Sequence, residues 1–173
     1  VQVHRGRRQL AVHHLRPVAE AGLQPTDYFP RTEQDVAALW TELTATVAAM
    51  GNPHLRALVE AFLQDPEIAE RYRTAPAAKT LHHAVLGGLL EHVVSLVRLG
   101  GPAARHYPIV DPDLLLTGIV LHDLGKIYEL DYRRSFSYTT AGQLLGHMAI
   151  VVALLHTKTA AVPGFPPRLA TLV

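Results

Sequence analysis

Residues 111–126 read DPDLLLTGIVLHDLGK, and this stretch decides how the fold is interpreted. Asp111 is a good N-cap, and Pro112 suits the first position of a helix, where a backbone N–H is not needed. The apolar residues that follow predict a buried helix that runs to His122-Asp123, with Gly125 as the residue that ends it. The starting interpretation is therefore a helical bundle in which one helix ends with an imidazole beside a carboxylate.

The segments before and after this stretch also have helical punctuation. Thr32 is expected to cap a first helix, because apolar residues recur after it at three-to-four spacing. A longer apolar segment begins at residue 77, and Gly100-Gly101-Pro102 is expected to end it. Residues 126–138 are expected to form irregular or short extended structure. Thr140-Ala141-Gly142-Gln143 resembles a capping box that opens a later helix. Further boundaries are expected at Gly51-Asn52-Pro53, Asp65-Pro66 and Pro76.

Residues 1–24 differ from the rest of the chain. Their strand-like pieces, Val1-Gln2-Val3 and Gln9-Leu10-Ala11-Val12, flank a turn-like, arginine-rich stretch. Two short strands do not bury a core, so this segment is expected either to pack on the rest of the chain or to be the remainder of a β-domain. Residues 25–32 read as a linker because of their prolines and turn formers, and residues 33–173 are expected to form one helical domain.

Composition limits the chemistry that is available. The 173 residues include 16 Lys and Arg, 15 Asp and Glu, 11 His and no Cys. The net charge of +1 creates no strong field toward nucleic acid or membrane, and any metal must be bound by nitrogen and oxygen. The longest uncharged apolar runs are about eight residues, against roughly 20 for a bilayer span, and no signal peptide is visible. We therefore expect a cytoplasmic location and no membrane partner.

The residues at the end of the 111–126 helix are the main candidates for chemistry. Adjacent helical side chains point about 100° apart, so His122 and Asp123 converge on one ion only near a helix end. Lys126 would lie beside that ion, placed to meet a phosphate. His92 has small neighbours one turn away, which leave room for an ion. Together these residues predict a shared metal, although a solvated helix end and a core histidine bonded to a carbonyl are alternatives.

Other polar residues are expected near this site. We place His82 and His83 at its rim as candidate substrate-binding residues, and Lys79 is a second candidate phosphate contact after Lys126. His147 is expected to support a ligand, to bind a second ion or to relay a proton. No phosphate-binding P-loop, H-E-x-x-H, EF-hand loop or G-x-S-x-G elbow competes with this interpretation.

Several stretches, taken in order, resemble the HD superfamily of metal-dependent phosphohydrolases and its H…HD…D signature. The similarity is greater to one branch, the bacterial 3′→5′ exoribonucleases called YhaM, in which an OB-fold precedes the HD domain. The matching stretches are Gln9-Leu10-Ala11-Val12, Asp27-Tyr28-Phe29-Pro30, Ala75-Pro76-Ala77-Ala78-Lys79, His82-His83-Ala84, Gly87-Gly88-Leu89-Leu90-Glu91-His92, Asp113-Leu114-Leu115-Leu116-Thr117-Gly118, Leu121-His122-Asp123-Leu124-Gly125-Lys126, Tyr138-Thr139 and Gly142-Gln143-Leu144-Leu145-Gly146-His147.

The resemblance implies an all-α HD-domain bundle behind a short β remnant of an OB-fold, a module that binds single-stranded nucleic acid. It implies that His92, His122 and Asp123 bind one or two divalent ions, manganese first, with cobalt, magnesium, nickel or iron as alternatives. The implied reaction is 3′→5′ exoribonuclease hydrolysis of single-stranded RNA, with single-stranded DNA as a further option, releasing nucleoside monophosphates. Asp123, Lys126 and His147 would act in catalysis, and a homo-oligomer is an option.

Departures from the family pattern leave alternatives open. The closing Ser-His-His-Gly segment and the final Asp ligand of the family are not found before Val173, so we expect an incomplete metal site and a natural protein that continues at both ends. One alternative is an HD-type phosphohydrolase that acts on free or signalling nucleotides. Another is a non-catalytic helical regulatory module in which the histidines are structural.

Overall fold

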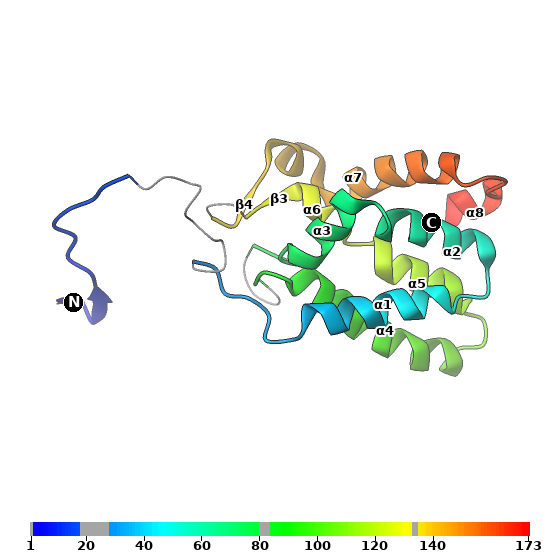
Figure 1. Ribbon diagram of the computed structural model, residues 1–173, viewed down its shortest axis with the longest axis horizontal. Helices are drawn as coiled ribbons and strands as arrows, with labels where there is room; N and C mark the ends of the chain where they lie inside the picture. The colour runs from blue at the N-terminus through cyan, green and yellow to red at the C-terminus, as the bar shows by residue number, and fades with distance from the viewer. Residues whose placement is uncertain (1, 18–27, 80–83, 133–134) are drawn as a thin grey trace.

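The computed structural model describes residues 2–17, 28–79, 84–132 and 135–173 (Figure 1). These residues form a mostly helical body behind a short N-terminal hairpin, as the sequence predicted. The hairpin consists of β1 (Gln2–His4) and β2 (Arg7–Gln9). The helical body contains α1 (Val36–Ala48), α2 (Pro53–Leu63), α3 (Pro66–Thr74), α4 (Gly88–His106), α5 (Pro112–Leu121), α6 (Lys126–Glu129), α7 (Thr140–Ala161) and α8 (Pro167–Leu172), with β3 (Leu130–Asp131) and β4 (Ser137–Tyr138) between α6 and α7.

Short polar residues cap the starts of five of the described helices. The side chains of Asn52, Asp65 and Asp111 each accept two backbone N–H groups, and a proline follows each of them at the first helical position. The cap of α1 is Asp35 rather than Thr32, so that expectation was wrong. The Thr32 hydroxyl instead accepts from the Gln34 N–H and donates to the Glu91 carboxylate on α4, at 2.6 Å.

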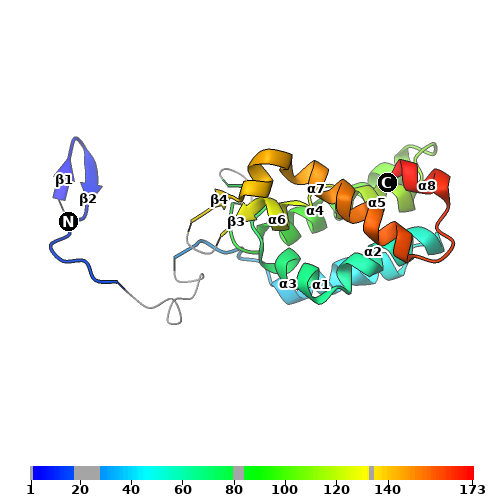
Figure 2. The same ribbon diagram turned by 90° about the horizontal axis from the view of Figure 1, so that it is seen from above.

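The core lies between α1, α2, α3, α4 and α5, with further side chains from α6 and α7. Figure 2 shows these helices from above. Apolar side chains with almost no exposure fill it, because each helix presents an apolar face at helical spacing. Tyr72 of α3 is fully buried in it, and its hydroxyl donates to the backbone carbonyl of Val120 in α5 at 2.8 Å. That bond ties α3 to the end of α5 that leads into the candidate site.

Helix α4 does not end at Gly100-Gly101-Pro102, as the sequence suggested, but continues to His106 with Pro102 inside it. The glycine at 100 has a packing role instead. A Cβ atom on Gly100 would lie 2.6 Å from Cδ1 of Ile119, so the Ile119 side chain of α5 packs directly against the backbone of α4 at this glycine.

The segment after α5 folds into a short helix and a small hairpin. Strands β3 and β4 are antiparallel, with Leu130 opposite Tyr138 and Asp131 opposite Ser137. The hairpin returns the chain to α7, whose N-cap is Thr139 rather than Thr140. Helix α7 bends at Gly146, where φ is 72° and ψ is 160°. The expectation of irregular or short extended structure over 126–138 therefore holds, apart from the turn of helix in α6.

The N-terminal strands pair Gln2 with Gln9 and His4 with Arg7, and a turn with positive φ at Arg5 and Gly6 joins them. The second strand ends at Gln9 and does not run on to Val12, as the sequence suggested. Its residues are exposed.

Helix α7 is long and apolar enough, by length and composition alone, to cross a membrane, which the short uninterrupted apolar runs of the sequence did not predict. Core helices and signal sequences share these two properties, so length and composition alone do not make α7 a membrane span. In this structure the bend at Gly146 interrupts the helix, and Val151 and Leu155 pack into the core.

Candidate metal centre

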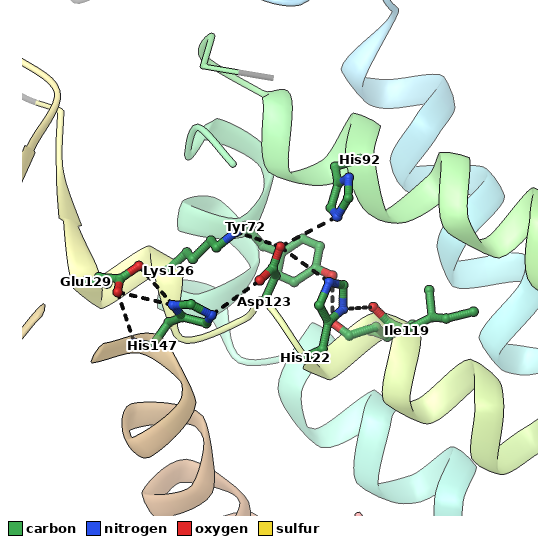
Figure 3. Close-up of polar contacts among 9 residues, drawn as sticks. Tyr72, His92, Ile119, His122, Asp123, Lys126, Glu129 and His147 are labelled. Carbon is green, nitrogen blue, oxygen red and sulfur yellow. Dashed lines mark hydrogen bonds and ion pairs between the residues drawn. The ribbon is translucent and has the colours of Figure 1, made fainter. Parts of the chain in front are cut away.

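The carboxylate of Asp123 lies at the centre of a cluster of basic side chains (Figure 3). Its Oδ2 atom is 2.8 Å from Nζ of Lys126, 3.3 Å from Nε2 of His122 and 3.6 Å from Nε2 of His92. Its Oδ1 atom faces the other way and is 3.6 Å from Nε2 of His147. Three imidazoles and one ammonium therefore surround a single carboxylate that is only 5% exposed.

Four separate elements bring these side chains together. His92 projects from the first half of α4, and His122 is the C-cap of α5. Asp123 lies in the turn between α5 and α6, whose first residue is Lys126. His147 follows the bend in α7. The convergence therefore depends on the close packing of α4 on α5 and of α6 on α7.

The ring of His122 has a defined orientation. Its Nδ1 atom is 2.9 Å from the carbonyl oxygen of Ile119, one turn earlier in α5. A carbonyl oxygen only accepts, so Nδ1 must donate its proton there. Nε2 therefore faces Asp123, as a donor when the ring is charged and with the lone pair that a metal ion would bind when the ring is neutral. Histidines that bind metals are usually held in this way, with the second ring nitrogen bonded to a carbonyl or a carboxylate.

The electrostatics of the cluster keep Asp123 ionised. Burial raises the pKa of Asp123, but the hydrogen bonds and positive charge of His122 and Lys126 outweigh burial and lower the pKa to about 2. The hydrogen bond with Asp123 in turn raises the pKa of His122, against the effect of burial. Burial and the nearby charge of Asp123 both raise the pKa of Tyr72, which therefore stays protonated beneath the site. The cluster thus presents a charged carboxylate at neutral pH.

The residues present fit a divalent metal ion. One ligand atom each from His92, His122 and Asp123 lie within 4.8 Å of one another. Two imidazoles with one carboxylate suit manganese, iron, cobalt, nickel or zinc, and the chain has no thiolate to favour a softer ion. The carbonyl contact of His122 supplies the outer support that such ligands require.

The structure places the other predicted residues unevenly. His147 and Lys126 join the cluster, as described above. Lys79 is exposed, and its Nζ lies 5.6 Å from the centre of the Tyr138 ring rather than against Asp123. His82 and His83 lie outside the described residues.

Two features of the site were not expected from the sequence. Glu129 was not assigned to the site, yet its buried carboxylate contacts the His147 ring at 3.1 Å. Gly125 was expected to end α5, but its φ of −59° is helical and it opens α6. A Cβ atom at Gly125 would collide with the backbone carbonyl of His147, so the glycine allows α7 to approach the site. Only a contact between distant segments reveals either role.

Comparison with known proteins places this cluster in a family context. Residues 89–161 match the HD domain family, a range that includes all five cluster residues. The chain is also similar to proteins named 3′-5′ exoribonuclease YhaM. One from Bacillus subtilis (strain 168) is 38% identical over 156 residues, which is 90% of this chain and 49% of that protein. One from Listeria monocytogenes serotype 4b (strain CLIP80459) is 36% identical over 153 residues, 88% of this chain and 48% of that protein.

A third relative, YhaM of Oceanobacillus iheyensis, is 37% identical over 149 residues, which is 86% of this chain and 46% of that protein. The chain therefore spans about half the length of the curated relatives it matches. No solved structure matches it significantly.

Proposed function

Because this chain carries an HD domain and is related to exoribonucleases named YhaM, we propose that it is a metal-dependent phosphodiesterase that removes nucleoside monophosphates from the 3′ end of single-stranded RNA. In this proposal His92, His122 and Asp123 bind a divalent ion, manganese first, and His147 lies on the other side of Asp123 as a ligand of a second ion or as a proton relay.

One observation carries this proposal. Nitrogen atoms of three histidines converge on the two oxygens of a carboxylate that stays ionised. When the rings are neutral, a cation among these nitrogen atoms and the carboxylate oxygens, which lie 3.3 to 3.6 Å apart, would be stabilised by all of them.

A divalent ion held here would polarise a phosphate oxygen and lower the pKa of a bound water toward 7. Asp123 would keep the centre negative enough to hold the cation. Lys126 is 19% exposed at its side chain and already donates to Asp123, so its ammonium group can contact a phosphate oxygen at the edge of the centre. His147 would receive or supply a proton through Nε2 on the opposite side.

The polymer substrate is supported by the names of the relatives and by the N-terminal segment. Arg5, Arg7 and Arg8 are exposed around the β1–β2 hairpin, where they can contact backbone phosphates. We propose that residues 1–24 are the end of an OB-fold and that residues 33–173 belong to the HD domain. Lys79, which lies over the exposed ring of Tyr138, would contact the incoming strand near the hairpin β3–β4.

The direct test is to incubate the chain with manganese and 5′-labelled single-stranded RNA. Stepwise shortening from the 3′ end is expected, and an Asp123→Asn variant should not shorten the RNA although it folds. A chain that binds no manganese and shortens no RNA would contradict the proposal and favour the regulatory-module alternative.

A second experiment separates RNA from free nucleotides as substrate. Replacing Arg5, Arg7 and Arg8 together with alanine should weaken RNA hydrolysis, and raising the salt concentration should have less effect on the variant than on the original chain. Hydrolysis of a small phosphodiester should not change. If free or signalling nucleotides are hydrolysed well, RNA is not, and the arginine variant behaves like the original chain, the mononucleotide alternative is correct.

A further inference from the structure

We propose that Glu129 is a positioning residue, which fixes the ring of His147 with the proton on Nδ1 and the lone pair of Nε2 directed at Asp123. The inference rests on the proposed function only in that His147 is taken to belong to the metal centre. Neither the sequence motifs nor the family match assigns a role to Glu129.

The geometry is shown in Figure 3. Both carboxylate oxygens of Glu129 lie 3.1 Å from Nδ1 of His147. The Oε1 atom also accepts the backbone N–H of the same residue, at 3.1 Å. A carboxylate only accepts hydrogen bonds, so Nδ1 must be the donor. The side chain and the backbone of His147 are thus held by one buried group, which prevents rotation of the ring.

The fold is built to allow this contact. The bend at Gly146, with its positive φ, places the His147 N–H at the start of the second part of α7, where an acceptor from outside the helix is useful. Glycine at 142 lets α7 pass over the end of α6, because a Cβ atom there would collide with the backbone carbonyl of Glu129. Glycine at 125 does the same for the backbone of His147.

In the neutral ring with the proton on Nδ1, the lone pair of Nε2 lies 3.6 Å from Oδ1 of Asp123. An acceptor aimed at a carboxylate oxygen is unfavourable on its own and favourable around a cation. His122 reaches the same state through the Ile119 carbonyl, so both rings present Nε2 to opposite oxygens of one carboxylate.

The test reads the ring protonation directly in the chain without added metal. Histidine is labelled with ¹⁵N, long-range ¹H–¹⁵N correlation spectra are recorded at alkaline pH, and a His147→Gln variant identifies the signals of His147. The expected spectrum shows the proton on Nδ1. A Glu129→Ala variant should show a mixture of both tautomers, whereas Glu129→Gln, which keeps one acceptor oxygen, should largely restore the Nδ1–H form.

Manganese titration supplies the second measurement. Loss of an outer partner of a ligand usually weakens metal binding about 10- to 100-fold, and we expect that range for Glu129→Ala. The matched control is Glu42→Gln, which removes one negative charge from a surface pair with Arg98 and should bind manganese like the original chain.

The outcomes separate this inference from the proposed function. If His147 of the original chain carries its proton on Nε2, or if folded Glu129→Ala keeps the original tautomer, the positioning role is wrong even if RNA is hydrolysed. If the tautomer is as expected but the original chain binds no manganese, the positioning role stands and the proposed function fails. If Glu129→Ala does not fold, the original chain and Glu129→Gln still decide the question.

Discussion

His122 and His147 both direct Nε2 toward Asp123, but the contacts that orient the two rings differ in their range along the chain. His122 is held by Ile119, three residues earlier in the same helix. His147 is held by Glu129, 18 residues earlier and in another helix. The half of the centre with His122 is therefore oriented by local structure, with His92 joining it from α4, and the half with His147 exists only after α6 and α7 have packed.

This difference predicts where the centre is robust. The α5–α6 turn with Asp123 should survive changes that disturb α7, while the His147 side should depend on every close approach between α6 and α7. Four changes test the comparison, beginning with the one that removes the feature common to both halves.

Replacing Asp123 with asparagine should abolish function on both sides. The variant loses the negative charge that would hold a cation, and with it several kcal/mol of transition-state stabilisation. We therefore expect phosphodiester hydrolysis to decrease by about 10³-fold. Hydrolysis rates and manganese titration check the result. Equal activity of the variant and the original chain would remove the carboxylate from the mechanism.

Gly125→Ala should break the long-range half. The added Cβ meets the backbone carbonyl of His147, which cannot give way like a side chain, so we expect a loss of about 3 kcal/mol in the free energy of unfolding. The matched control is Gly118→Ala in α5, where a Cβ meets nothing within 4 Å. The control should gain up to about 1 kcal/mol from helix propensity. Thermal and denaturant unfolding measure both, and similar effects at 118 and 125 would contradict the packing role.

Low pH should decrease the stability contributed by the half of the centre with His122 and Asp123. The pKa of Asp123 is lowered from 3.8 to about 2, so its ionised form contributes stability at neutral pH that is lost as the pH falls through this range. A shift of this size corresponds to about 2 kcal/mol. The raised pKa of His122 acts in the opposite sense, since its contribution is present at lower pH and is lost as the pH rises through the folded value.

Denaturant unfolding of the chain without added metal, from pH 2 to pH 8, measures these contributions. The slope below pH 4 should be smaller in Asp123→Asn than in the original chain. An identical pH dependence of the two proteins would show that the contacts of Asp123 do not favour its ionised form.

The smallest effect is expected beneath the site. Tyr72→Phe removes the hydroxyl that donates to Val120 and leaves a buried carbonyl without that partner, which should cost about 1 kcal/mol in the free energy of unfolding. Manganese affinity should change little, because Tyr72 is not a ligand. A large loss of affinity would show that the end of α5 needs this bond to hold His122 and Asp123 in place.

Much of the fold was visible in the sequence because its signals are local. Caps at Asp111, Asn52 and Asp65 stand next to prolines and predict helix starts directly. The errors came where a residue serves a distant neighbour. Gly100 looked like part of a helix end but allows α4 to pack on Ile119, and Gly125 looked like a helix stop but makes room for α7. Glycine both marks the ends of helices and allows segments to pack closely, so the residue type alone does not show which of the two roles it has.

The amino-acid sequence by itself determined a helical domain and a histidine beside an aspartate at the end of one helix. It also indicated that His92, on an earlier helix, shares a metal ion with that pair. The sequence also indicated His147 as a member of the site, but tertiary structure alone decided that it faces the opposite oxygen of Asp123 and that Glu129 holds it there. The reason is physical: helix caps and periodicity act over one or two turns, whereas the direction of an imidazole depends on an acceptor that can come from any part of the chain.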